Sequence, residues 1–211
     1  MRLARWLGPM ALALALGGCL GGLLPETGER AQYAFPDPAA MSVDRALPGA
    51  VLVEMPSAVA PRDGSDILVL RSDGEFQWLP GARWAAGVPQ LLQEAIARQI
   101  EAAKAAPAAV RLAQAHAVPF RLGVEIHGFE LREEGDSFAA HGSISLRLVC
   151  TRDARLLASS EPISVEARPV PTGTATATQA MRQTAALLAR QATLWLARSD
   201  VNGCVPQPDA S

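Results

Sequence analysis

Two neighbouring segments of this sequence, 120–127 and 137–150, alternate between apolar and polar residues. Such alternation predicts β-strands with one buried face, because successive side chains of a strand point to opposite sides of the sheet. Residues 133–136 predict the turn between them, and residues 156–168, interrupted at Pro162, predict a third strand. The fold must therefore contain an antiparallel meander with one apolar face to cover. The apolar set is Phe120, Leu122, Val124, Ile126, Phe138, Ala140, Gly142, Ile144, Leu146, Leu148 and Cys150.

Gly128 interrupts the first of these strands. Phe129 and Leu131 continue the apolar set, but one residue out of phase with Ile126. A glycine at such a phase slip predicts a β-bulge, in which one strand carries an extra residue.

Two other stretches show the three- and four-residue spacing of apolar side chains that is typical of amphipathic helices. The first apolar stripe comprises Trp84, Val88, Leu91, Leu92, Ala95, Ile96 and Ile100, and Pro107 ends the helix. The second helix runs from about Thr176 to Arg198, with Met181, Ala185, Leu188, Ala192 and Trp195 on its stripe.

Shorter strands are predicted at 51–54, 66–70 and 75–78, the last two as a hairpin around Ser72-Asp73-Gly74. Pro80 and Gly81 then break the pattern before the first helix. These elements predict an α+β fold: a two-layer domain with a mainly antiparallel sheet and two amphipathic helices packed on one face.

The N-terminus has the order of a secretory signal: Arg2 and Arg5, an apolar run over 6–16, then small residues. The run is shorter than the roughly 20 residues that cross a bilayer. Leu16-Gly17-Gly18-Cys19 resembles the lipobox of bacterial lipoproteins, which implies that Cys19 carries lipid. Leu20, rather than Asp, after the cysteine implies the outer membrane, with the inner membrane as the alternative. An ordinary signal peptide with a chance cysteine is the other interpretation.

The chain is therefore divided into a signal peptide (1–18), a lipidated N-terminus and flexible tether (19–48), a single periplasmic domain (49–205) and a disordered tail (206–211). Residues 20–48 are rich in Gly, Pro, Ala and Glu and show no periodicity, with Gln32 to Phe35 as a stretch that could be ordered. Removing the signal leaves 193 residues, enough for one domain with a core, and a formal charge of −4. No basic patch suggests a nucleic-acid partner.

Two cysteines remain once Cys19 is used for lipid. In an oxidising compartment, Cys150 and Cys204 predict a disulfide, with two free buried thiols as the alternative.

The sequence shows no phosphate-binding loop and no metal-ligand spacing, so we expect neither an enzyme nor a cofactor. His127 and His141 lie on the polar faces of paired strands with Glu125 nearby, a set that could bind zinc. A solvated sheet face is the favoured interpretation, and no metal is expected. We predict instead that Glu125, His127, His141 and Arg147 form a polar partner-binding surface on the face opposite the helices.

Two segments resemble the ABC-type transport auxiliary lipoprotein family, which includes PqiC-like lipoproteins. Arg83-Trp84 followed by Gly87-Val88-Pro89-Gln90-Leu91-Leu92 matches its first helix, and 120–130 matches its strand beginning Phe-Arg-Leu. Tyr33-Ala34-Phe35 is the counterpart of the family's opening strand. The resemblance implies a non-catalytic lipoprotein that docks to or receives from an MCE-domain protein and its ABC permease and ATPase complex in intermembrane lipid transport.

Two other functions remain open from the sequence. One is an outer-membrane assembly or structural lipoprotein, and the other, less favoured, is a hydrolase or metal-dependent enzyme. Homo-oligomerisation is also possible under each of these functions.

Overall fold

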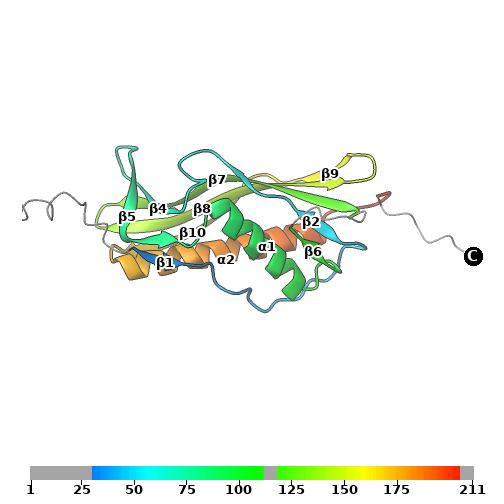
Figure 1. Ribbon diagram of the computed structural model, residues 1–211, viewed down its shortest axis with the longest axis horizontal. Coiled ribbons are helices and arrows are strands. Elements are labelled where there is room, and N and C mark those ends of the chain that lie inside the picture. The colour runs from blue at the N-terminus through cyan, green and yellow to red at the C-terminus, as the bar shows by residue number, and fades with distance from the viewer. Residues whose placement is uncertain (1–29, 112–117, 205–211) are drawn as a thin grey trace, which may run out of the picture. The chain divides into compact units, whose positions relative to one another are not determined.

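The computed structural model describes residues 30–111 and 118–204 as one sheet of ten strands and two helices (Figure 1). The compact unit that they form begins at Ala31. The elements are β1 (Ala31–Tyr33), β2 (Val51–Val53), β3 (Ser57–Ala58), β4 (Asp66–Leu70), β5 (Phe76–Trp84), α1 (Val88–Ala102), β6 (Ala109–Val110), β7 (Phe120–Glu134), β8 (Ser137–Cys150), β9 (Leu156–Ser159), β10 (Ile163–Pro171) and α2 (Thr174–Arg198).

The expected meander forms the centre of the sheet. Strands β7 and β8 pair antiparallel over their whole length, and the register shifts between Ile126 and Gly128. The predicted bulge at Gly128 is therefore confirmed. The third predicted strand is split by the segment around Pro162 into β9 and β10, which both pair with β8. Proline has no N–H to donate to a ladder, which explains the break.

The opposite edge of β7 is lined by β2, β3 and β4, which all run parallel to it. Strand β6 pairs with β2, β5 pairs antiparallel with β4, and β1 adds to β5 in parallel. The sheet is thus mixed, with its longest ladders antiparallel. Parallel pairing arises because β2–β4 and β7 are joined through a crossover that contains α1.

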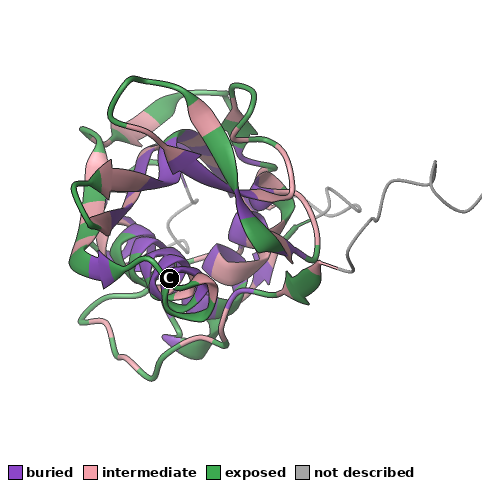
Figure 2. Ribbon diagram, turned by 90° about the vertical axis from the view of Figure 1, so that its left-hand side faces the viewer, coloured by how far each residue is buried: buried purple, intermediate pink, exposed green. Residues whose placement is uncertain are grey.

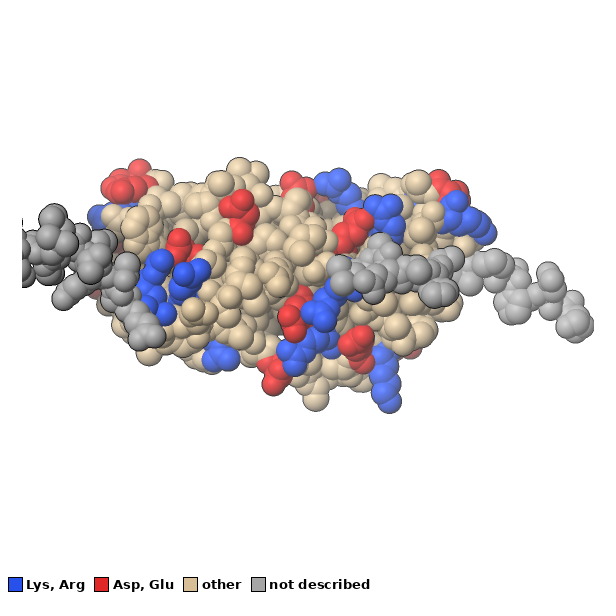
Figure 3. Space-filling model, viewed as in Figure 1, with Lys and Arg blue, Asp and Glu red and all other residues tan. Residues whose placement is uncertain are grey.

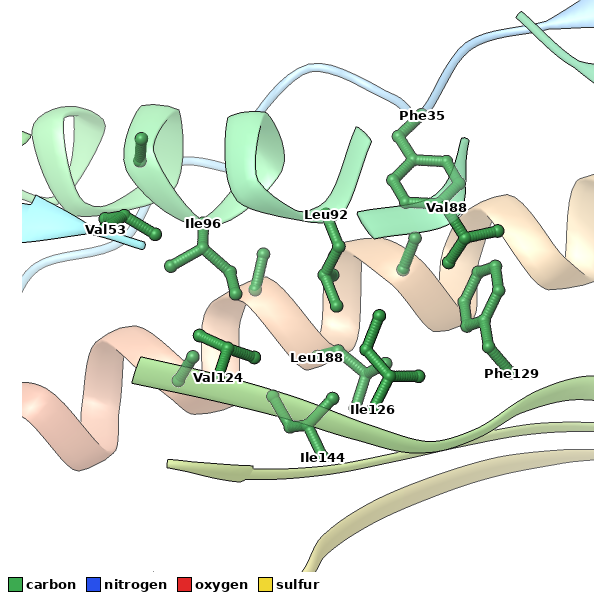
Figure 4. Close-up of a cluster of buried hydrophobic side chains, with 14 of the residues drawn as sticks. Phe35, Val53, Val88, Leu92, Ile96, Val124, Ile126, Phe129, Ile144 and Leu188 are labelled. Carbon is green, nitrogen blue, oxygen red and sulfur yellow. The ribbon is translucent and has the colours of Figure 1, made fainter. Parts of the chain in front are cut away.

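Both helices contact the sheet and each other, and they cover one of its faces, which confirms the α+β prediction. Figure 2 shows buried residues gathered between the helices and the strands. Figure 4 shows the contact itself, with Leu92 and Ile96 of α1 facing Val124 of β7 and Ile144 of β8. Leu188 brings α2 into the same cluster. This apolar layer is the core of the domain.

The first helix begins later than the sequence predicted. It starts at Val88, with Gly87 as its N-cap and Pro89 in its first turn, and Trp84 ends β5 instead. Pro80 and Gly81 lie inside β5, where the pairing jumps from Arg83 to Trp78 and Gly81 has a φ of +73°. They bend the strand rather than end it, because glycine tolerates positive φ.

The tether prediction is wrong for residues 36–48, whereas the stretch 32–35 that the sequence allowed to be ordered is ordered. Strand β1 pairs with β5, and Phe35 and Leu47 are 8% and 4% exposed. Phe35 packs edge-on against Trp84 with a 5.0 Å centroid distance. These contacts hold a segment without any periodic pattern to the domain. The predicted signal peptide, Cys19 and the 206–211 tail lie outside the described residues.

Neither α1 nor α2, the helices in the described ranges, combines the length and apolarity that would let it cross a bilayer.

Candidate functional site

Three of the four residues predicted to bind a partner lie together on the sheet face opposite the helices. The Arg147 guanidinium donates to the Glu125 carboxylate over 2.8 Å. His127 Nε2 forms a 2.9 Å hydrogen bond with the hydroxyl of Ser145, which pairs with Glu125 across β7 and β8. The alternation of the two strands therefore places this polar set as the sequence predicted.

These residues border a concave surface, which we call the outer groove, with a volume of about 310 Å³. The segment between β2 and β3 forms one wall, and strands β7 and β8 form the floor. The residues that line it are Glu54, Met55, Ser57, Gly123, Val124, Glu125, Ser145, Arg147 and Val149.

Gly123 keeps this groove open. A Cβ atom at this position would lie 3.3 Å from a carboxylate oxygen of Glu54, on the opposite wall. Any larger side chain would fill the space between Glu54 and Arg147, which pairs with Gly123 in the ladder. The sequence indicated Gly123 only as one position of an alternating strand. Its role follows from the approach of Glu54, a residue far away in the chain.

Charges around the groove are matched in pairs. Arg121 contacts Glu54, and Arg147 contacts Glu125, so each carboxylate is neutralised by a neighbouring guanidinium. The Arg147 and Glu125 side chains are 61% and 43% exposed, and exposed pairs of this kind add little to stability. On the face shown in Figure 3, acidic and basic side chains are likewise interspersed.

Apolar side chains accompany these charges. Met55 is 56% exposed at the groove wall. Val149 lies opposite Leu156 of β9 in the ladder, and Leu156 is 54% exposed. The surface therefore combines an apolar patch with paired charges, a composition that is usual in protein interfaces.

His141 lies apart from the other three residues. The bulge places it opposite Glu130, whereas His127 bonds to Ser145 on the other side of the shift. The set of His127, His141 and Glu125 is thus not brought together. Within the ranges 30–111 and 118–204, no group of three or more His, Cys, Asp or Glu side chains could hold a metal ion. His116 falls outside those ranges.

Glu130 is a fully buried carboxylate that the sequence analysis missed. It accepts hydrogen bonds from Arg62 at 2.8 Å, from the Phe129 N–H at 2.9 Å and from Arg132 at 3.0 Å. Burial alone would raise the pKa of Glu130, but these donors and their charges outweigh it and hold the pKa below 4.5. The carboxylate joins the 59–65 segment, through Arg62, to the sheet.

Burial also acts on His141, which lies beside this cluster. It lowers the pKa of the imidazole below 6.5, and the charge of Arg132 acts in the same direction. His141 is therefore part of a structural cluster that the polar pattern of β8 did not reveal.

The structure joins Cys150 and Cys204 in a disulfide with a Cα–Cα distance of 5.6 Å. Both residues are buried, and the bond ties the end of β8 to the segment that follows α2.

Comparison with known proteins places this geometry in a family. Residues 33–193 match the ABC-type transport auxiliary lipoprotein component. The structure is similar to that of XCC0632 from Xanthomonas campestris, of the family DUF330, with a TM-score of 0.70 and 25% identity over 78% of this chain and 94% of that one. A second crystal structure, of an uncharacterized protein, shares the fold with a TM-score of 0.54, 19% identity, and coverage of 77% and 97%. Comparison with the curated proteins found no match. The match over most of the chain shows that this protein belongs to the family of ABC-type transport auxiliary lipoproteins.

Proposed function

We propose that this protein is the lipid-anchored auxiliary component of an MCE-type ABC transport system. It acts at the periplasmic face of the outer membrane as a docking or receiving component for intermembrane lipid transport, without catalysis of its own. Membership of the transport auxiliary family supports the transport role. The resemblance of 16–19 to a lipobox supports attachment through Cys19.

The outer groove is the docking surface in this proposal, and its composition is the observation that carries the assignment. A site for lipid chains is expected to be concave and mainly apolar. The outer groove instead carries Glu54, Glu125 and Arg147 beside Met55 and Val149. Such a surface suits a protein partner, here the MCE-domain protein, better than it suits a hydrocarbon chain.

The matched charges suggest how the partner is recognised. An exposed ion pair contributes little while water surrounds it, but a complementary charge on a partner gives orientation and faster association. Arg147 and Glu125 together present one cation and one anion at a fixed spacing of 2.8 Å. The partner is expected to present the opposite pattern.

The test is co-purification of the MCE component from membranes with the full-length lipoprotein. Arg147→Glu places two carboxylates side by side, and we expect recovery to fall about tenfold, which corresponds to about 1.4 kcal/mol of binding free energy. Arg98→Glu is the matched control, because Arg98 is also an exposed arginine in ion pairs, but on α1 rather than in the groove. Its recovery should equal that of the wild type.

The double variant Glu125→Arg with Arg147→Glu separates recognition from folding. It restores an ion pair within the domain but reverses the charge pattern, so recovery should stay low. Wild-type recovery by the double variant would assign the effect to local structure and contradict the docking surface. Failure of the wild-type protein to recover any MCE component, or stoichiometric extraction of phospholipid by the domain, would contradict the function itself.

A further inference from the structure

Trp78 is a large aromatic side chain left in contact with water. It is 62% exposed, although an indole ring is large enough to bury 150–250 Å². It lies in the first half of β5, opposite Leu68 of β4 and close to the turn at 71–75. Tryptophan is enriched at protein interfaces and in membrane-interface belts, where one end of the ring is apolar and the other is wet.

The bend in β5 holds Trp78 in this position. Leu79, the next residue, is 3% exposed and enters the core, so the Trp78 side chain points to the other side of the strand. Gly81 supplies the positive φ of the bend, and the Thr174 hydroxyl donates to the Pro80 carbonyl, which ties the bend to the start of α2. The exposure of the ring is thus built into the fold and does not arise from a loose loop.

The chain enters the domain on the same side. Strand β1 runs parallel to β5, with Ala31 beside Ala82, so its N-terminal side faces the part of β5 that holds Trp78. We call this end, with the turns at 71–75 and 134–137 and the start of α2, the hairpin end (Figure 1). Eleven residues separate Cys19 from Ala31, and a fully extended chain of this length spans at most about 40 Å.

The hairpin end carries more acidic than basic side chains. Arg71 lies 3.7 Å from Asp73, and Arg168 lies 3.1 Å from Glu134, whereas Glu75, Glu133 and Asp136 add further carboxylates to the two turns. A zwitterionic bilayer has no net charge to repel this excess. The indole ring, with an apolar body and one N–H donor, is a side chain that favours the membrane–water interface.

We propose that the hairpin end rests on the bilayer that holds the lipid anchor, with the Trp78 ring inserted among the phospholipid headgroups. The inference rests on the proposed lipid attachment at Cys19, which brings a membrane to this end of the domain. The outer groove is lined by the half of β7 and β8 nearer to Cys150. In this orientation it therefore lies away from the membrane, where a periplasmic partner can reach it.

The experiment uses the full-length lipidated protein in phosphatidylcholine vesicles with and without brominated phosphatidylcholine, which quenches nearby indole fluorescence. After removal of the signal peptide, the tryptophans are Trp78, Trp84 and Trp195. We expect brominated lipid to quench the wild type, and Trp78→Phe to lose most of that quenching. Trp195→Phe is the control and should keep it. Raising the salt concentration should leave the quenching unchanged, because insertion of the ring does not depend on charge.

Each other outcome overturns the proposal. Equal quenching in Trp78→Phe and the wild type would show that Trp78 does not meet the lipid. Absence of quenching in protein that floats with the vesicles would show that the anchor holds while the hairpin end stays away from the bilayer. Failure of the protein to float with the vesicles would show that no lipid anchor holds it, and would contradict the proposed orientation. Trp78→Phe should recover the MCE component as well as the wild type does. A failure of the membrane-contact proposal can therefore be distinguished from a failure of the outer groove as the docking surface.

Discussion

At the scale of single residues, two tryptophans in the same strand have opposite roles. Trp84, at the end of β5, is 1% exposed and packs against Phe35 and Phe129 at centroid distances of 5.0 and 5.9 Å. Trp78, six residues earlier, is 62% exposed. The sequence predicted a buried Trp84, which is confirmed, but it placed the residue in the first helix, which is wrong.

We expect Trp84→Ala to lower the free energy of unfolding by about 3–5 kcal/mol, because it removes a buried ring and leaves a cavity. Trp78→Ala should change it by less than about 0.5 kcal/mol, because its ring is in solvent. Denaturant midpoints of the two variants measure the difference. Equal midpoints would show that the aromatic cluster is not part of the stabilising core.

The pair of Glu130 and His141 makes stability depend on pH. The pKa of His141 is lowered in the folded state, so the folded protein binds fewer protons at this residue than the unfolded chain does. The free energy of unfolding therefore falls as the pH drops below 6.5. The Glu130 carboxylate, whose pKa is also lowered in the folded state, causes a second loss of stability as the pH falls below 4.5, because the unfolded chain takes up protons there before the folded protein does.

His141→Gln should remove only the loss of stability that His141 causes. Unfolding measured from neutral to acidic pH tests this, with the exposed His127→Gln as the control; an unchanged profile in His141→Gln would contradict it.

At the scale of elements, the fit of β8 against α2 depends on a missing side chain. A Cβ atom at Gly142 would lie 2.7 Å from Thr184 Cγ2 and 2.8 Å from Leu188 Cδ1. Real Cβ atoms do not approach other atoms so closely, so α2 can pack at its present distance only while residue 142 is glycine.

Gly142→Ala should therefore destabilise the domain by about 1–3 kcal/mol through overpacking. Gly64→Ala is the matched control, since a Cβ there would approach no atom closer than 3.4 Å. Thermal melts of both variants measure the cost. A Gly142→Ala variant as stable as Gly64→Ala would mean that the helix moves away at no cost.

The elements also show where local patterns succeed. The period-two alternation predicted β7 and β8, and the phase slip at Gly128 located the bulge between them. Trp84 was assigned to a helix because its spacing from Val88 fits a helical stripe as well as it fits the end of a strand. The N-cap at Gly87 and Pro89 in the first turn are what set the boundary.

At the scale of the whole molecule, the disulfide links two regions that are far apart in sequence. Cys150 and Cys204 are separated by 54 positions and close the segment that contains β9, β10 and α2. In the chain-entropy model, closure of a loop of this size stabilises the fold by about 4 kcal/mol.

The double variant Cys150→Ala with Cys204→Ala should lose about that amount in a denaturant titration. Thiol labelling of the oxidised, denatured wild-type mature protein should find neither cysteine free. Two labelled thiols in the wild type, or a double variant of unchanged stability, would contradict the stabilising bond.

The sequence alone determined the class of the fold, the central meander, the pairing of the cysteines and the family, because each of these leaves a local or countable pattern. Only the tertiary structure decided that residues 31–48 join the domain through Phe35 and Leu47, and that β2–β4 run parallel along β7. It also brought Glu54 to Glu125 in the outer groove and Arg62 to the buried Glu130. These contacts join residues that are distant in the chain. Their register is set by the packing of the whole core, so no short window of sequence records them.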